Sequence, residues 1–65
     1  MRKRTYKPIE EAPNDGTPIV GVCGGVEMAV YWEGDPLNLW AYWDEDGSEE
    51  FSWPRQQPTE WREMF

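Results

Sequence analysis

Apolar and polar residues alternate along residues 18–33 in the pattern of two short β-strands joined by a turn. The segments "IVGVC" (19–23) and "VEMAVYWE" (26–33) place small or apolar residues at every second position, and this period of two is typical of β-strands. The Gly24-Gly25 pair between them suits a type I′ turn, because both central positions of that turn need a positive φ. The pattern therefore predicts a β-hairpin.

The same alternation predicts which residues face each other across the hairpin. A two-residue turn sets the register, and a slip of one residue would move every side chain to the opposite face. We expect the pairs Cys23–Val26, Gly21–Met28 and Ile19–Val30, with Trp32 continuing this apolar face. The other face is mixed and is expected to be half exposed; it carries Val20, Val22, Glu27, Ala29, Tyr31 and Glu33.

Two further strands are predicted after the hairpin. The loop "GDPLN" (34–38) leads to the aromatic segment "LWAYW" (39–43), which is expected to form a third strand, and "EFSW" (50–53) is expected to form a fourth. Asp46-Gly47 is a turn signal between them. Prolines 54 and 58 should end the fourth strand.

The two ends of the chain contribute little regular structure in this interpretation. Residues 1–7 are expected to be a flexible basic tail, and residues 10–13 allow one helical turn at most because prolines interrupt the segment 8–18. Residues 59–65 are expected to close the chain as a short strand or a single helical turn. The predicted fold is a single all-β domain over residues 1–65, a meander of about four antiparallel strands with at most short helical turns.

A chain of 65 residues must stabilise a small core, and aromatic side chains are the available material. A single cysteine excludes an intrachain disulfide, and the absence of histidine argues against a zinc site. We expect Trp32 and one of Trp40 and Trp43 to belong to the core. Trp43 and Phe51, which end and start paired strands in this interpretation, are also expected to be core residues. Trp53 or Trp61 is the expected aromatic anchor of an interface, since tryptophan is enriched among interface hot spots.

Charge is distributed unevenly along the sequence. The chain has 13 acidic and 6 basic residues, and four of the basic residues lie in the first seven positions. Residues 8–65 therefore carry 13 acids against Arg55 and Arg62, a net charge of −11. Such a field repels nucleic acid and lipid headgroups and attracts basic surfaces. The alternative is that the acidity serves only solubility.

The stretch "WDEDGSEEF" (43–51) concentrates this negative charge between two aromatic residues. Residues two apart on an extended strand lie roughly 6.6 to 6.8 Å apart, a spacing of the order of the step between phosphates, so Asp44 and Asp46 could imitate a nucleic-acid backbone. The alternative is a charged loop that discourages edge-to-edge pairing of sheets. The candidate partner-binding acids are Asp44, Glu45, Asp46, Glu49 and Glu50, extended by Glu27, Glu33 and Asp35.

Metal and catalytic readings of these residues are weaker. "DEDGSEE" resembles the start of a calcium loop but lacks the further ligands at fixed spacing and the flanking helices. Cys23 has no histidine to activate it and is expected to be a small buried residue. We therefore expect no metal, no cofactor and no enzymatic activity.

Two motifs resemble a small family encoded in phages and prophages. The family pattern P-I-E-x-A-P-x-D-G-T-P matches residues 8–18, and P-T-x-W matches "PTEW" at 58–61. This chain departs from the family pattern at Tyr6, where tryptophan is usual, and at Glu60, where histidine is usual. The resemblance implies a phage origin and a small β fold, and it implies no particular activity.

Small acidic phage proteins without catalytic residues are similar in general character to anti-CRISPR proteins. The expected function is therefore a non-enzymatic inhibitor, an acidic DNA mimic that occupies the DNA-binding surface, including the short recognition motif beside the target, of a Cascade-type surveillance complex. We expect it to act as a monomer in the cytoplasm of the infected cell, without binding nucleic acid or membrane itself. The alternative is a phage accessory protein that binds another protein through exposed aromatic residues.

Overall fold

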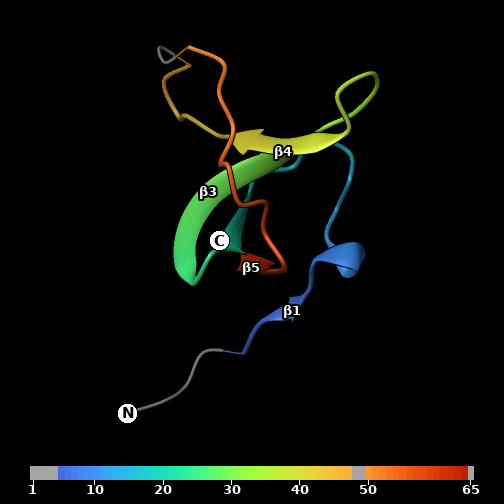
Figure 1. Cartoon of the computed structure of the whole chain (residues 1–65), viewed down its shortest axis with the longest axis vertical. Coiled ribbons are helices and arrows are strands. Elements are labelled where there is room, and N and C mark those ends of the chain that lie inside the picture. Colours follow the sequence, from blue (N-terminus) through green and yellow to red (C-terminus); the bar gives the residue numbers. More distant parts are fainter. Residues whose placement is uncertain (1–4, 48–49, 65) are drawn as a thin grey trace.

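The computed structural model describes residues 5–47 and 50–64, which form one five-stranded antiparallel sheet (Figure 1). This confirms the predicted all-β class, and the one helical element is a 3-10 turn, η1 (Ile9–Glu11). No helix in the described residues is long and apolar enough to cross a membrane. The strands are β1 (Lys7–Pro8), β2 (Ile19–Cys23), β3 (Val26–Glu33), β4 (Leu39–Tyr42) and β5 (Glu60–Glu63).

The β2–β3 hairpin has the register expected from the sequence. Ile19 faces Val30, Gly21 faces Met28 and Cys23 faces Val26. Gly24 and Gly25 both have positive φ, 58° and 84°, as a type I′ turn requires. Alternate residues of β2 are buried, so the predicted apolar face is the face that packs into the core.

The order of strands in the sheet is β1-β5-β2-β3-β4. Strands β2, β3 and β4 follow one another as the expected meander requires, but β5 joins the sheet on the other side of β2, so the sheet as a whole is not a simple meander. Strand β5, from the end of the chain, lies between β1 and β2 and pairs with both. Of the two alternatives expected for residues 59–65, a short strand or a single helical turn, the structure has the strand. Lys7 belongs to β1 and pairs with Trp61, while residues 1–4 of the expected basic tail lie outside the described residues.

The expected fourth strand at residues 50–53 is also absent over its described residues, which have no regular structure. Only one backbone hydrogen bond, from Tyr42 N–H to Ser52 C=O at 2.9 Å, joins this segment to β4. Continuing the pairing in that register would place Pro54 opposite Trp40, and proline has no N–H to donate to the ladder. The segment therefore leaves the sheet as an arm alongside the edge of β4.

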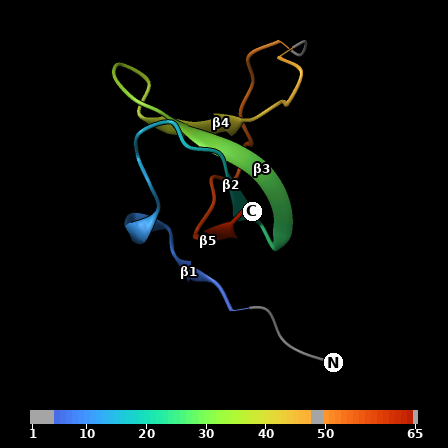
Figure 2. The same ribbon diagram turned by 180° about the vertical axis from the view of Figure 1, so that it is seen from behind.

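The sheet is curved (Figures 1 and 2). The core lies on one of its faces, as the register of the strands shows. Its buried centre comprises Ile19, Val30, Trp40 and Trp61, with Ile9, Ala12, Met28 and Trp32 packed against it. The rings of Trp32 and Trp40 meet edge to face, with centroids 5.3 Å apart, which is a favourable arrangement for aromatic pairs. The expectation that Trp32 and one of Trp40 and Trp43 belong to the core is confirmed, with Trp40 as that residue. The separate expectation that Trp43 is a core residue is wrong, because Trp43 follows the end of β4 and is only half-buried.

Candidate binding surface

The acidic segment after β4 begins with a tight turn over residues 44–47, which we call the acidic turn. Gly47 N–H donates to the Asp44 carbonyl at 3.1 Å, and Asp46 N–H donates to Asp44 Oδ1 at 3.3 Å. Gly47 has a φ of 67°, a conformation that glycine adopts at little cost. Asp44 and Asp46 are therefore not on an extended strand, and the strand-like spacing expected for them is wrong.

Three carboxylates of this segment are available to a partner. Glu45, Asp46 and Glu50 are exposed, and within residues 5–47 and 50–64 none of them forms an ion pair. Asp44 is half-buried and holds the turn through the hydrogen bond described above. Glu49 lies outside the described residues.

The other three candidate acids lie elsewhere and have internal partners. Glu27 binds Arg62, with Arg62 Nη2 at 3.1 Å from Glu27 Oε1, and it also accepts a hydrogen bond from Tyr6. This pairing raises the pKa of Arg62 above its ordinary value, chiefly through the hydrogen bond to Glu27. Glu27 is next to the Gly-Gly turn of the hairpin, far along β3 from the acidic turn (Figure 1).

Glu33 and Asp35 lie at the opposite end of β4 from residues 44–47 (Figures 1 and 2). Glu33 accepts a hydrogen bond from the Tyr31 hydroxyl at 2.8 Å, which raises the pKa of that phenol. Asp35 accepts one from Asn38 Nδ2 at 3.0 Å. The seven predicted acids that the structure describes thus fall into three groups, and the group at the acidic turn has the most carboxylates.

Exposed aromatic side chains adjoin the acidic turn. Phe51 and Trp53 are each 49% exposed and their ring centroids are 5.5 Å apart, while Tyr42 is 41% exposed. The expectation that Phe51 is buried in the core is wrong, because the arm that carries it is not part of the sheet. Trp53, one of the two residues considered as an aromatic anchor, is exposed, as an anchor must be.

Trp61, the other alternative, is a core residue with 6% exposure. It lies on β5 opposite Gly21, and Lys7 Nζ is 4.9 Å from the centre of its ring. Its candidacy as an interface anchor is therefore wrong. The physical reason is the insertion of β5 between β1 and β2, which turns this side chain toward the core.

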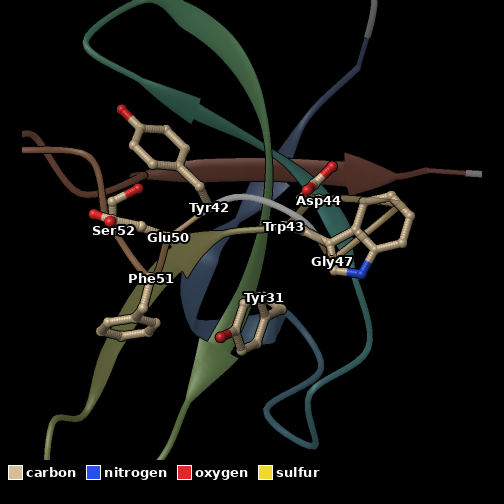
Figure 3. Close-up of a pocket in the computed structure, with 8 residues that line it drawn as sticks. All are labelled: Tyr31, Tyr42, Trp43, Asp44, Gly47, Glu50, Phe51 and Ser52. Atoms are coloured by element: carbon tan, nitrogen blue, oxygen red, sulfur yellow. The ribbon is translucent and has the colours of Figure 1, made fainter.

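A pocket of ≈ 430 Å³ opens where the acidic turn and the arm meet β3 and β4 (Figure 3). Four aromatic residues, two acidic residues and two small residues line it: Tyr31, Tyr42, Trp43, Phe51, Asp44, Glu50, Gly47 and Ser52. No pattern in the sequence indicates this pocket, because Tyr31 comes from a different strand. The pocket can be expected only once the pairing of β3 with β4 is known, because that pairing places Tyr31 opposite Ala41, next to the last residue of β4.

The described residues offer little for nucleophilic or metal chemistry. Cys23 is buried and free, and burial raises the pKa of its thiol, so the reactive thiolate is disfavoured. Among the described residues, no group of three or more Cys, Asp or Glu side chains is arranged to hold a metal ion. The surface at the acidic turn carries negative charge beside exposed aromatic rings.

Comparisons with known proteins found no matching family model, no matching curated protein and no matching solved structure.

Proposed function

We propose that this protein is a non-enzymatic binding protein that occupies a basic surface of another protein. One observation carries the proposal: the carboxylates of Glu45, Asp46 and Glu50, which have no ion pair in the described part of the chain, lie in the same segment as the exposed rings of Phe51 and Trp53. We call this segment, residues 44–47 and 50–53, the acidic-aromatic surface.

The two kinds of side chain have different parts in the proposed binding. Carboxylates attract a basic partner from a distance and raise the association rate, but at physiological salt their field is screened beyond about 8 Å. Aromatic rings act only at contact, where they bury apolar area and slow dissociation. A surface that combines both can form a complex that persists at physiological salt.

More specifically, we propose that the protein is a phage-encoded inhibitor that competes with nucleic acid for its partner. A surface that binds DNA is rich in Lys and Arg, and the net charge of −11 over residues 8–65 favours such a target. The resemblance of residues 8–18 to a phage-encoded family supports a phage origin, and the small size and acidity of the chain are similar in general character to anti-CRISPR proteins. The proposed target is therefore a Cascade-type complex in the infected cell's cytoplasm. The protein would then block the surface that binds the target duplex.

A pull-down from host lysate, followed by competition with duplex DNA, tests this function. A partner that duplex DNA displaces is the expected result. A partner that stays bound in excess DNA would contradict competition with nucleic acid.

A pair of charge-matched triple variants tests the surface itself. Glu45→Lys, Asp46→Lys and Glu50→Lys together should abolish binding. The control carries Glu10→Lys, Glu11→Lys and Glu60→Lys, three exposed positions on η1 and β5. Both triple variants change the net charge from −7 to −1, so equal losses would show that only total charge matters.

A second function is supported by the exposure of Phe51 and Trp53 alone. In that case the protein is an accessory protein that binds its partner through these rings, and the acids serve solubility. Binding that survives the Glu45, Asp46 and Glu50 reversals but is lost in Trp53→Ala would identify this function.

A further inference from the structure

The pocket beside the acidic turn has a lining that is complementary to a cation. The faces of aromatic rings carry negative potential, and Tyr31, Trp43 and Phe51 contribute three rings. The ring of Tyr42 lies on the opposite face of the sheet from that of Tyr31, since Tyr42 pairs with Val30 and Tyr31 with Ala41. Asp44 and Glu50 are the acidic residues of the lining, which includes no Lys or Arg among the described residues. Figure 3 shows these side chains coming from β3, the end of β4, the turn and the arm.

Hydrogen bonds hold the walls of the pocket in place. The Tyr31 hydroxyl is bound to Glu33 at 2.8 Å, and Trp43 N–H donates to the Ala29 carbonyl at 3.0 Å. The bond from Tyr42 N–H to Ser52 C=O at 2.9 Å joins β4 to the arm that carries Phe51. Because these contacts exist before any ligand binds, binding need not order the walls, and affinity gains from this preorganisation.

We propose that this pocket binds the guanidinium group of an arginine side chain on the partner protein. The proposal rests on the proposed function, since it supplies the residue-level contact for a basic partner surface. The volume of ≈ 430 Å³ is near the lower end of small-ligand pockets, so it suits one long side chain rather than a larger group.

Arginine is favoured over lysine by its chemistry. Its guanidinium is planar, stacks on aromatic rings and is more weakly hydrated than an ammonium group. Its five N–H donors are arranged as a rigid fork that can bind both oxygens of one carboxylate, and the pocket offers the exposed carboxylate of Glu50. A lysine ammonium would have to give up tightly bound water to lie among aromatic rings.

Small arginine derivatives test the pocket without the partner. The probes are N-acetyl-arginine methylamide, its lysine counterpart, and its citrulline counterpart, which keeps the shape of arginine but has no charge. We expect saturable NMR shifts of the Trp43 indole N–H and the Tyr31 and Phe51 ring protons with the arginine probe. The lysine probe should bind several-fold more weakly, and the citrulline probe should cause no saturable shift.

Two variants in the same turn separate the pocket from general acidity. Glu50→Gln removes a carboxylate that lines the pocket, and Glu45→Gln removes one that does not, with the same change in net charge. We expect Glu50→Gln to weaken binding of the arginine probe about fivefold or more, and Glu45→Gln to leave it nearly unchanged. Phe51→Leu should weaken binding by removing one ring, and the exposure of this side chain makes loss of folding unexpected.

Three results would overturn the inference: equal binding of the arginine and citrulline probes, tighter binding of the lysine probe, or equal effects of the two Gln variants. Its failure can be told apart from failure of the proposed function. If the pocket inference alone fails, the charge-reversal variants still lose binding of the basic partner, but Glu50→Gln and Glu45→Gln have the same effect on binding of the arginine probe. If the proposed function fails, no partner is displaced by DNA whatever the probes do.

Discussion

The side-chain amide of Gln57 forms hydrogen bonds with both backbone polar groups of Trp40. Gln57 Oε1 accepts from Trp40 N–H at 2.7 Å, and Gln57 Nε2 donates to the Trp40 carbonyl at 3.0 Å and to the Pro54 carbonyl at 3.1 Å. Trp40 is on β4, the last strand of the sheet, so its edge would otherwise leave unpaired N–H and C=O groups. The Gln57 side chain thus supplies the hydrogen bonds that a neighbouring strand would make with Trp40, at a position where Pro54 has no N–H to donate.

This relationship makes Gln57 a stability determinant that its polar character does not suggest. Gln57→Leu should lower the free energy of unfolding by about 1–3 kcal/mol, because it leaves the Trp40 groups without partners in a half-buried place. Urea denaturation monitored by tryptophan fluorescence measures the change. The control is Gln56→Leu, an exposed neighbour, and equal effects of the two substitutions would contradict the role assigned to Gln57.

Gly21 should not tolerate a side chain. A Cβ atom at this position would lie 2.9 Å from Pro58 Cβ and 2.9 Å from Val30 Cγ2, so Gly21→Ala requires the sheet and the segment above it to move apart. We expect a loss of about 1–3 kcal/mol, the usual range for overpacking. Gly34→Ala is the control, because the nearest atom there is Trp32 Nε1 at 3.9 Å. Thermal unfolding should show a clear fall in Tm for the first variant only.

The β1–β5 pairing should give stability a specific pH dependence. Lys7 Nζ lies 2.9 Å from Glu63 Oε1, and this hydrogen bond lowers the pKa of Glu63 below its ordinary value. A carboxylate with a lowered folded-state pKa contributes stability above its unfolded-state pKa, and this contribution is lost as pH falls through the folded-state value. Lys7→Met should therefore raise the pKa of Glu63 in an NMR titration and make the acid-induced loss of stability smaller.

The comparison variant for this pH effect is Lys7→Arg, which keeps the positive charge. Its Glu63 titration should stay close to that of the unsubstituted chain. A Glu63 pKa that is unchanged in Lys7→Met would contradict the assigned cause. Any loss of the contact between Lys7 and the Trp61 ring affects stability at all pH values, so the pH dependence isolates the carboxylate.

Kinetics should separate the charges from the aromatic rings in any complex. Glu45→Lys with Asp46→Lys should slow association and reduce its dependence on salt, because these carboxylates act at a distance. Trp53→Ala should leave the association rate nearly unchanged and speed dissociation about tenfold or more, since an exposed ring contributes only at contact. Surface plasmon resonance at two salt concentrations measures both rates. If Trp53→Ala changed only the association rate, the assignment of association to the carboxylates and dissociation to the ring would be contradicted.

The local features of the fold could be predicted from the sequence, and the long-range ones could not. The hairpin register depends on Gly24-Gly25 and on alternation within 15 residues, so it is contained in one short segment. The position of β5 depends on contacts such as Gly21–Trp61, forty residues apart. Alternation can show that residues 60–63 form a strand, but it does not show which strands they join.

The misassigned aromatic residues have the same origin. Trp61 was one of two alternatives, with Trp53, for an exposed interface anchor because tryptophan is enriched among hot spots, yet a strand between two others turns one face to the core. Phe51 looked like a strand residue by composition, but Pro54 and the Gln57 amide end the pairing that would have buried it. For the candidate surface, the sequence located the acidic turn but not the pocket, which requires Tyr31 from β3.

The position of β5 also sets when the molecule can fold during synthesis. A ribosome adds about 5–20 residues per second, so β5, which pairs with β2 from forty residues further along the chain, is made roughly 2–8 s later, and until then β2 has no neighbour on one side. During that interval the nascent hairpin exposes the edge that β5 later covers. A peptide with the sequence of β5 supplied from outside should compete for that open edge, because the sheet is completed only after residues 60–63 have been made.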